Sequence, residues 1–424
     1  MKEIRSNLAN VCIVIVDPFS AGALLAEALH MRGAQCIAIQ STTRLPPSMR
    51  SRFDPGLFHD IIQPSRNMQD TVHAVQSHRP SHVIAGCESG VELAEYLCDR
   101  LNLPGNGGGL RGARRDKYRM AEAVKACGLR TAQQFQSQDP AQIIDWIQGR
   151  LDWPVILKPT NSTASDHVFR CHTVDDVAEA AQRILSETNV LGQQNQTVLV
   201  QEFLAGPEYV VDTVSLEGQR KTTAFWQYHR PADSGRFVSY DAMTLLPYDG
   251  ERQQALQSYA YEVLDALAIN FGPAHCELMW VDGEPILVEV GARLSGGINA
   301  VLSGICGGLC QLDETVDLIL SPRKFRESLH ERRSLTKRAA SVFLLPRQRG
   351  RLIRVNGLEK IENLPTLHSM SVSAQPGDEL KKVAGLVVLV DKDLEAIERD
   401  IDVIRRVERD GLFEVKDTSS SDLS

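Results

Sequence analysis

The chain has 424 residues, of which 43% are hydrophobic and 24% charged, and its formal net charge is -8 at pH 7. This length predicts roughly two to four domains. The acidic balance argues against a nucleic-acid partner or an anionic membrane surface. No apolar run approaches the roughly 18 residues of a membrane span, and the first residues lack the small-residue cleavage site of a signal peptide.

The nine cysteines are scattered along the chain. None forms a CxxC pair, and no histidine lies near the closest two, Cys306 and Cys310, to complete a zinc site. This usage predicts reduced thiols, most of them packed in the core, in a cytoplasmic protein.

The first hundred residues alternate between apolar strands and helical patterns. The spacing predicts strands over 11–18, 34–41 and 81–87, and helices over 20–33, 68–80 and 89–105. Continuous apolar strands that alternate with helices are typical of a doubly wound parallel sheet. The turn "DPFSAG" (17–22) lacks the glycine spacing of a dinucleotide-binding fingerprint, so a nicotinamide oxidoreductase has only this α/β pattern in its favour.

The rest of the chain predicts a mixed α/β protein with further domains. The glycine-rich, charged stretch 106–115 marks a boundary. The expected units are an N-terminal domain over 1–113, a central domain over 114–325, a C-terminal domain over 326–416 with short strands and one helix (392–409), and a disordered tail over 417–424. Within the central domain we expect helices over 116–129 and 173–187, and strands within 153–171 and 197–219.

Two glutamates interrupt a predicted apolar hairpin, "CELMWVDGEPILVEVGAR" (276–293), whose turn is Asp282-Gly283. A loop of three or five residues would place Glu277 directly opposite Glu289 on one face of the sheet. A two-residue loop would send Glu289 to the other face, because side chains alternate along a strand. Pro285 disfavours the two-residue loop, since proline donates no ladder hydrogen bond. The sequence therefore favours a facing carboxylate pair.

Facing carboxylates on apolar strands serve as general acid and base, share a proton or bind a hard cation. Arg293 follows Glu289 by four residues, which places both on one face of an extended chain. A glycosidase-like acid–base pair would explain the carboxylates but would leave the lysines described next without a role. If the register separates the two acids, both are ordinary surface glutamates.

Two lysines and a hydroxyl-rich loop suit a bound phosphate. Lys158 ends an apolar strand and precedes the loop "PTNSTASDHV" (159–168), which offers hydroxyls and backbone N–H groups without being a Walker A loop. Lys117 begins a helix and could bring a second cation to the same anion, although each lysine taken singly also fits a solvated surface. In "VQEFLAGPEYVVD", Glu202 and Glu208 lie on either side of a turn, where a carboxylate suits a ribose and hinge backbone groups suit an adenine edge.

In their order and spacing these four motifs resemble the ATP-grasp ligases, and within that superfamily the L-amino acid ligases, dipeptide synthetases of the bacilysin synthetase type. The resemblance runs from about residue 10 to the C-terminus. It implies an ATP-grasp fold with an N-terminal pre-ATP-grasp domain, a lid over about 155–220 and a C-terminal mixed domain. Related carboxylases usually have Asn two residues after the second glutamate, where this chain has Gly291. A third magnesium ligand would then come from a phosphate, a water or another residue.

The resemblance also implies a role for each matching residue. Catalysis would use Arg293 and Lys158. The ATP-binding residues would be Lys117, Lys158, Ser162, Thr163, Ser165, Glu202, Phe203, Leu204 and Glu208. Glu277 and Glu289 would bind Mg²⁺, with Mn²⁺ able to substitute. The substrate-binding residues would be Arg293, Ser295, Gly296, Gly297 and His229, with a plain surface histidine as the alternative for His229. Gly297 stands where a related enzyme has a bulky aromatic residue, which implies a roomier pocket.

The implied activity is an ATP-dependent carboxylate–amine ligase. It would join amino acids, or amino-acid-like acids, through an acyl phosphate, release ADP and phosphate, and could serve dipeptide antibiotic synthesis. Its partners would be ATP and two small molecules, a carboxylate donor and an amine acceptor, and the family also admits a homodimer. The alternatives are a carboxylase-type ATP-grasp enzyme that phosphorylates bicarbonate, which the missing Asn opposes, and a nucleotide-binding module without turnover.

Overall fold

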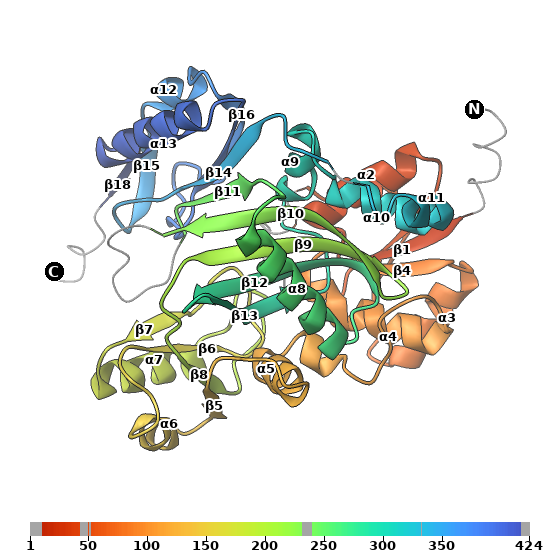
Figure 1. The fold of residues 1–424 in the computed structure, drawn as a ribbon, viewed down its shortest axis with the longest axis horizontal. Helices are drawn as coiled ribbons and strands as arrows, with labels where there is room; N and C mark the ends of the chain where they lie inside the picture. The colour runs from red at the N-terminus through yellow and green to blue at the C-terminus, as the bar shows by residue number, and fades with distance from the viewer. Residues whose placement is uncertain (1–10, 43–49, 51, 231–239, 332, 417–424) are drawn as a thin grey trace.

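The computed structural model describes residues 11–42, 50, 52–230, 240–331 and 333–416. Their helices and strands form a mixed α/β fold on four sheets, which confirms the predicted class (Figure 1). The predicted disordered tail, 417–424, lies outside the described residues. Among the helices of this described part, none combines the length and apolar character needed to cross a membrane.

The N-terminal region is built on a parallel sheet in the order β3-β2-β1-β4. Its strands are β1 (Cys12–Val16), β2 (Gln35–Ile39), β3 (Asp60–Ile62) and β4 (His82–Ala85). Its helices are α2 (Ala21–Met31), α3 (Met68–Ser77) and α4 (Val91–Leu101), with short 3-10 turns η2 (Pro55–Leu57), η3 (Glu88–Gly90) and η4 (Gly112–Arg114). Ile13 and Ile15 pack with α2 on one face, whereas Val14 and Val16 pack with α3 and α4 on the other. Because side chains alternate along β1, the sheet is covered on both faces, as the doubly wound prediction required.

A second four-stranded sheet has the order β5-β8-β6-β7 and lies beside the larger central sheet (Figure 1). Its strands are β5 (Gln134–Ser137), β6 (Val155–Pro159), β7 (Phe169–Cys171) and β8 (Val198–Glu202), and its helices are α6 (Pro140–Ile147) and α7 (Val174–Ser186). Val155 and Leu157 of β6 pack against Val177 and Ala181 of α7 in its own hydrophobic core. Helix α5 (Lys117–Ala126) precedes this sheet and is capped by the Asp116 side chain, which accepts from the Arg119 N–H. This small unit presents the loop between β6 and β7, residues 160–168.

The central sheet has eight strands in the order β13-β12-β9-β10-β11-β14-β17-β16. Their bounds are β9 (Glu208–Leu216), β10 (Gln219–His229), β11 (Ala242–Leu246), β12 (Phe271–Val281), β13 (Glu284–Gly291), β14 (Arg338–Leu344), β16 (Leu367–Val372) and β17 (Gly385–Asp391). Helix α8 (Glu251–Ala266) covers one face, where Leu256 and Val263 join the core with Val211 and Cys276. Since β11 pairs with β14, the sheet continues across residue 325, where we expected a domain boundary.

The last helices and strands complete the C-terminal part. They are α9 (Asn299–Ile305), α10 (Gln311–Leu320), α11 (Pro322–Glu327), β15 (Arg351–Val355), α12 (Leu358–Glu362), α13 (Leu394–Arg409) and β18 (Phe413–Lys416). Strands β15 and β18 form a separate pair. The sequence predicted one helix after residue 338, but the described residues contain two, because the short α12 has too few turns to show a helical period.

The β12–β13 hairpin corrects one expectation and confirms another. Val281 pairs with Glu284, so the loop is the two-residue Asp282-Gly283, and both residues have positive φ as a type I′ turn requires. Pro285 is tolerated because it lies on the edge strand opposite Trp280, whose N–H bonds instead to Pro207 on the other side. The predicted longer loop is therefore wrong.

A β-bulge nevertheless brings the two acids together. The register shifts between Glu277 and Leu278, so that Leu278 pairs with Leu287 and Glu277 pairs with Glu289, with Val288 as the extra residue. The predicted facing pair is thus confirmed, but by a bulge near the acids rather than by the length of the turn.

A glycine between β8 and β9 permits close packing of the hinge on the central sheet. A Cβ atom at Gly206 would lie 2.0 Å from the Trp280 carbonyl oxygen, a backbone atom that cannot rotate away. We expect Gly206→Ala to lower the free energy of unfolding by about 1–3 kcal/mol, as overpacking does, and, as the resemblance implies for this turn, to weaken ATP binding by displacing the hinge. Thermal unfolding with and without nucleotide measures both effects. Gly109→Ala is the control, since a Cβ atom there meets no atom within 4 Å; equal effects of the two variants would contradict the prediction.

Candidate active site

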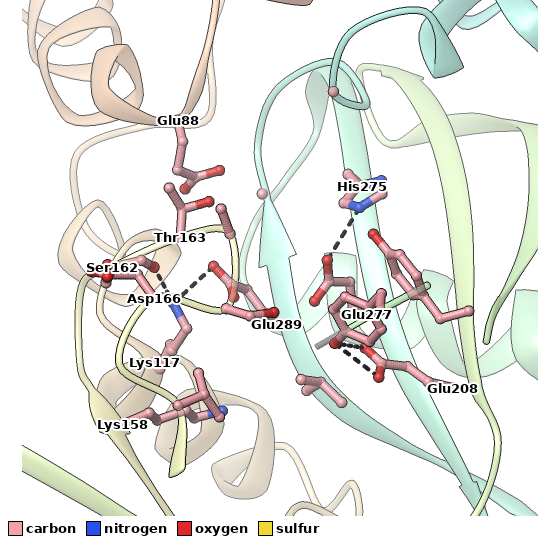
Figure 2. A pocket seen from close by; sticks show the side chains of 18 of the residues that line it. Glu88, Lys117, Lys158, Ser162, Thr163, Asp166, Glu208, His275, Glu277 and Glu289 are labelled. Carbon is pink, nitrogen blue, oxygen red and sulfur yellow. Dashed lines mark hydrogen bonds and ion pairs between the residues drawn. The ribbon is translucent and has the colours of Figure 1, made fainter. Parts of the chain in front are cut away.

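A pocket of about 560 Å³ lies where the three larger sheets meet, and it contains most of the residues that the sequence singled out. Its walls come from the loop after β4, the start of α5, the 160–168 loop, the hinge after β8, the β12–β13 hairpin and the β14–β17 region. Figure 2 shows acids and lysines from these separate segments pointing into one space. Among the described residues, no group of three or more His, Cys, Asp or Glu side chains has the geometry of a metal cage.

The two lysines lie at the 160–168 loop. The backbone N–H of Lys117 donates to the Thr160 carbonyl over 2.8 Å, which holds the start of α5 against the loop. Its Nζ donates to the Ser162 carbonyl over 2.5 Å and lies 3.0 Å from Glu289 Oε1 (Figure 2). Lys158 is buried at the end of β6 in the same pocket. This end of the pocket therefore offers two buried cations to an anionic ligand.

Burial makes Lys158 unusual. Loss of water around the ammonium is the larger cause, and repulsion from Lys117 the second, of a fall in the pKa of Lys158 to about 8. Attraction by Glu289 and Glu277 opposes this fall.

The loop that follows Lys158 has a strained backbone, with positive φ at Ala164 and Ser165. Ser162, Thr163 and Ser165 all line the pocket, and the Ser162 hydroxyl donates to Asp166 Oδ2 over 2.7 Å.

The hinge forms the apolar end of the pocket. Glu202, the last residue of β8, and Phe203 and Leu204, which follow it, line the wall together with Ile156, Met279 and Leu287. These apolar side chains suit a flat base between them. Glu208 is also in the pocket, but Arg230 donates to its Oε2 over 2.5 Å and the Tyr240 hydroxyl donates to its Oε1 over 2.8 Å. The binding of a ribose by Glu208 stays a prediction. A ribose hydroxyl would have to donate to the same carboxylate beside Arg230 and Tyr240, or in place of one of them.

The facing acids are held by two different cations. Glu289 pairs with Lys117, whereas Glu277 Oε1 lies 3.3 Å from His275 Nε2. His275 in turn bonds Asp212 Oδ1 over 2.7 Å, and the Trp226 indole N–H donates to Asp212 Oδ2 over 2.8 Å. Although burial opposes it, attraction by Asp212 raises the pKa of His275 to about 9, so the imidazole is protonated near neutral pH. A charged histidine held by Asp212 therefore orients Glu277.

The donor set fits Mg²⁺ as nucleotide enzymes hold it. Mg²⁺ is bound through one or two carboxylates together with substrate phosphates, rather than by an all-protein cage. Glu277 and Glu289 are directly opposite each other and both line the pocket, next to the lysines that would face the phosphates. The two acids would supply part of the coordination shell of Mg²⁺, and the phosphates of a bound nucleotide would supply the rest.

Arg293 lies two residues after the end of β13 and contacts the N-terminal region. Its Nε donates to Glu88 Oε2 over 2.8 Å, and Nη1 donates to the Leu294 carbonyl over 2.9 Å. Arg115 donates to the other oxygen of Glu88 over 2.6 Å and to the Asn161 carbonyl over 2.9 Å. The two guanidinium groups hold the pKa of Glu88 low, at about 2, against the effect of its burial.

The predicted substrate residues divide into two groups. Ser295, Gly296 and Gly297 line the pocket, and a Cβ atom at Gly297 would meet no atom within 4 Å, so there is open space beside it. His229 does not line this pocket. Its Nε2 lies 2.9 Å from Thr244 Oγ1, and the neighbouring Tyr228 and Arg230 line the pocket instead, as alternation along β10 dictates. The structure gives His229 no contact with the predicted substrate space.

Several residues that line the pocket were not predicted from the sequence. Glu88 follows β4, and the carboxyl end of a parallel strand is a usual place for ligand contacts, so that signal was available. His275 precedes Glu277 by two residues and shares its face of β12, but its partner Asp212 is known only from the pairing of β12 with β9. Phe343, Lys382, Val383 and Leu386 reach the pocket from the C-terminal part, and no local pattern marks them.

The chain is similar in sequence and in fold to known proteins. The model of the ATP-grasp domain matches residues 151–301. Dapdiamide A synthase of Enterobacter agglomerans is 31% identical over 414 residues, which cover 94% of this chain and 96% of that protein. The L-arginine-specific L-amino acid ligase of Bacillus subtilis is 21% identical over 305 residues, 70% of each chain. The crystal structure of an L-amino acid ligase from Bacillus licheniformis superposes with a TM-score of 0.75 at 17% identity, over 96% of this chain and 99% of that one.

Proposed function

The chain belongs to the ATP-grasp ligases, and we propose that it uses ATP to join two amino acids, or amino-acid-like acids, through an amide bond. The observation that carries this proposal is one pocket that holds two buried lysines, an arginine and a facing pair of glutamates around a space beside Ser295 to Gly297. The similarity to dapdiamide A synthase over nearly the whole chain supports an amide product, and the proposed place in dipeptide antibiotic synthesis rests on the motif resemblance to the bacilysin-type synthetases.

The reaction has two steps. A carboxylate oxygen of the donor attacks the γ-phosphorus of ATP, the bond from that phosphorus to the bridging oxygen breaks, and ADP leaves. The amine of the acceptor then attacks the carbonyl carbon of the acyl phosphate, phosphate leaves, and the nitrogen loses a proton. Both steps depend on positioning and on neutralising negative charge.

Each charged residue has a place in these steps. Lys117 and Lys158 would bind the phosphates and balance their charge, and Arg293 would bind the transferred phosphoryl group of the acyl phosphate. Glu277 and Glu289 would hold Mg²⁺, which when bound neutralises phosphate charge; Mn²⁺ in its place remains a prediction. The 160–168 loop would exclude water from the acyl phosphate.

The arrangement of the chain adds three subsidiary proposals. Residues 1–113, 114–325 and 326–416 would act as three domains, with a lid over about 155–220 that closes on ATP. The nine cysteines all lie in the described residues and all are free thiols, which supports a cytoplasmic location.

The third proposal is that the chain forms a homodimer. Light scattering would measure the mass of the particle and so test it.

The low pKa of Lys158 predicts a pH-dependent affinity for nucleotide. At pH 8 about half of the ammonium is charged and able to attract phosphate, and at pH 9 only about a tenth is, so we expect the Kd for ATP to rise by roughly fivefold between pH 8 and pH 9. Calorimetry of ATP binding without amine substrates measures this directly. Lys158→Arg keeps its charge at both pH values and should give a flat profile; an equally steep profile in this variant would assign the effect to another group.

The test of the proposed function is phosphate release from ATP and Mg²⁺ across a matrix of amino acid pairs, with product masses recorded. Release that requires two amino acids, with a product one water lighter than their sum, is the expected result. Release that depends on bicarbonate would support the carboxylase alternative instead. ATP binding without release across the matrix and with bicarbonate would favour the module without turnover.

A further inference from the structure

A buried glutamate from the N-terminal region contacts the arginine of the active site. Glu88 lies in the short turn η3 after β4, outside the segment 151–301 that matches the ATP-grasp domain model. Its side chain is only 6% exposed and lies between two guanidinium groups. Arg115 Nη1 is 2.6 Å from one carboxylate oxygen, and Arg293 Nε is 2.8 Å from the other. An acid that bridges two arginines in this way fixes the direction of both.

The neighbouring backbone leaves room for this bridge. A Cβ atom at Gly291 would lie 2.9 Å from Glu88 Oε2 and 3.1 Å from Arg293 Cζ. Any side chain at 291 would therefore press on the ion pair itself. Glycine at the end of β13 leaves the ends of both side chains in place.

The bridge also limits what Arg293 can do. Its Nε–H donates to Glu88 and one Nη1–H to the Leu294 carbonyl, so that within the described residues the second Nη1–H and both Nη2–H groups are left for a ligand. Arg115, on the other side of Glu88, donates to the Asn161 carbonyl at the start of the 160–168 loop. One carboxylate thus connects the N-terminal sheet, the arginine and the base of the phosphate loop.

We propose that Glu88 is a positioning residue that holds the Arg293 guanidinium against the transferred phosphoryl group. This inference rests on the proposed function for its chemistry. Because Arg293 would stabilise the acyl phosphate, a misdirected guanidinium leaves that intermediate longer exposed to water. The consequence is a loss of coupling: ATP is still split, but part of the acyl phosphate is hydrolysed before the amine attacks.

The experiment compares Glu88→Gln with wild type and with Glu95→Gln. Glu95 is the matched control, because it is a buried acid of the same region that pairs with Arg114 over 2.6 Å and does not line the pocket. With the amino acid pair found for the wild type, we expect Glu88→Gln to lower kcat by roughly 10- to 100-fold, the scale for a small misplacement of a reacting group. The KM for ATP should change less than kcat does, because Glu88 lies away from the hinge and reaches the 160–168 loop only through Arg115.

The ratio of phosphate released to amide formed separates positioning from folding. It should rise above one in Glu88→Gln and remain at one in Glu95→Gln. Gly291→Ala is a second, independent route, since its added Cβ presses on the pair without removing a charge, and it should raise the same ratio. A ratio of one in both Glu88→Gln and Gly291→Ala, or an equal rise in Glu95→Gln, would overturn the proposal.

A structural readout keeps this test independent of the substrates. Should the wild type form no amide from any pair, the proposed function fails but the positioning of Arg293 can still be measured. Crystal structures of Glu88→Ala and Glu95→Ala should then show the Arg293 guanidinium displaced by more than about 1 Å in the first variant only, a distance that matters for catalysis. An unmoved guanidinium in Glu88→Ala would overturn the inference.

Discussion

Replacing Arg293 with alanine is expected to slow ADP formation by roughly 10²–10³-fold, the usual loss when one charge-stabilising donor is removed from a transition state. The guanidinium lines the pocket beside the facing glutamates and is held by Glu88 and the Leu294 carbonyl, so its position is set before substrate binds. Coupled ADP detection with the amino acid pair from the matrix measures the effect, and circular dichroism checks that the variant is folded.

Two comparisons make the Arg293 result specific. Arg293→Lys keeps the charge but loses the planar fork, so it should recover only part of the rate. Arg130→Ala removes an exposed arginine that pairs with Glu284 over 3.4 Å, and it should leave turnover unchanged. Wild-type turnover in Arg293→Ala would remove this residue from the mechanism.

The second large effect is expected from Glu289→Gln, which removes one of the two facing carboxylate charges with little change in shape. Loss of the outer partners of a metal ligand commonly costs 10- to 100-fold, so loss of a ligand itself should cost more than about 100-fold in turnover. The same change deprives Lys117 of its ion-pair partner at 3.0 Å. We therefore expect both turnover and the Mg²⁺ dependence of nucleotide binding to fall.

Glu284→Gln is the matched control for Glu289→Gln. Glu284 begins the same strand, but its side chain is 67% exposed and makes only a surface contact. Calorimetry of ATP binding over a range of Mg²⁺ concentrations should show normal Mg²⁺ dependence in the control and a weakened one in Glu289→Gln. If Glu289→Gln binds and turns over MgATP like wild type, the facing pair is not the metal site.

Local patterns were enough to predict much of the fold. The N-terminal strands and helices were placed by hydrophobic period, and α5 was placed by Asp116 at its start and Gly128 at its end, because these features depend on neighbours within one or two turns. The hinge, the hydroxyl loop and the lysine at the end of β6 were likewise readable, since each is a short segment whose residue types already suit its chemistry.

The register of the β12–β13 hairpin could not be predicted from its own residues alone. Pro285 suggested a longer loop, but β13 is an edge strand and its proline faces away from the ladder, a fact that depends on the order of strands in the sheet. The bulge at Val288 then restored the facing pair. The predicted facing of Glu277 and Glu289 is correct, but the predicted loop length is wrong. The bulge that brings the two acids together depends on the packing of both strands, which the local sequence does not show.

The sequence by itself determined the kind of protein, and it singled out lysines, hydroxyls and carboxylates that line the pocket, because residue type and spacing along one segment mark them. Only the tertiary structure decided which distant residues meet: Glu88 with Arg293, Asp212 with His275, and Glu289 with Lys117, pairs separated by 205, 63 and 172 positions. It also placed Tyr228 rather than His229 in the pocket. Contacts of this kind arise from sheet order, register and the packing of the N-terminal region on the rest of the chain, and a charge buried at such a contact is stable only where the fold supplies its partner.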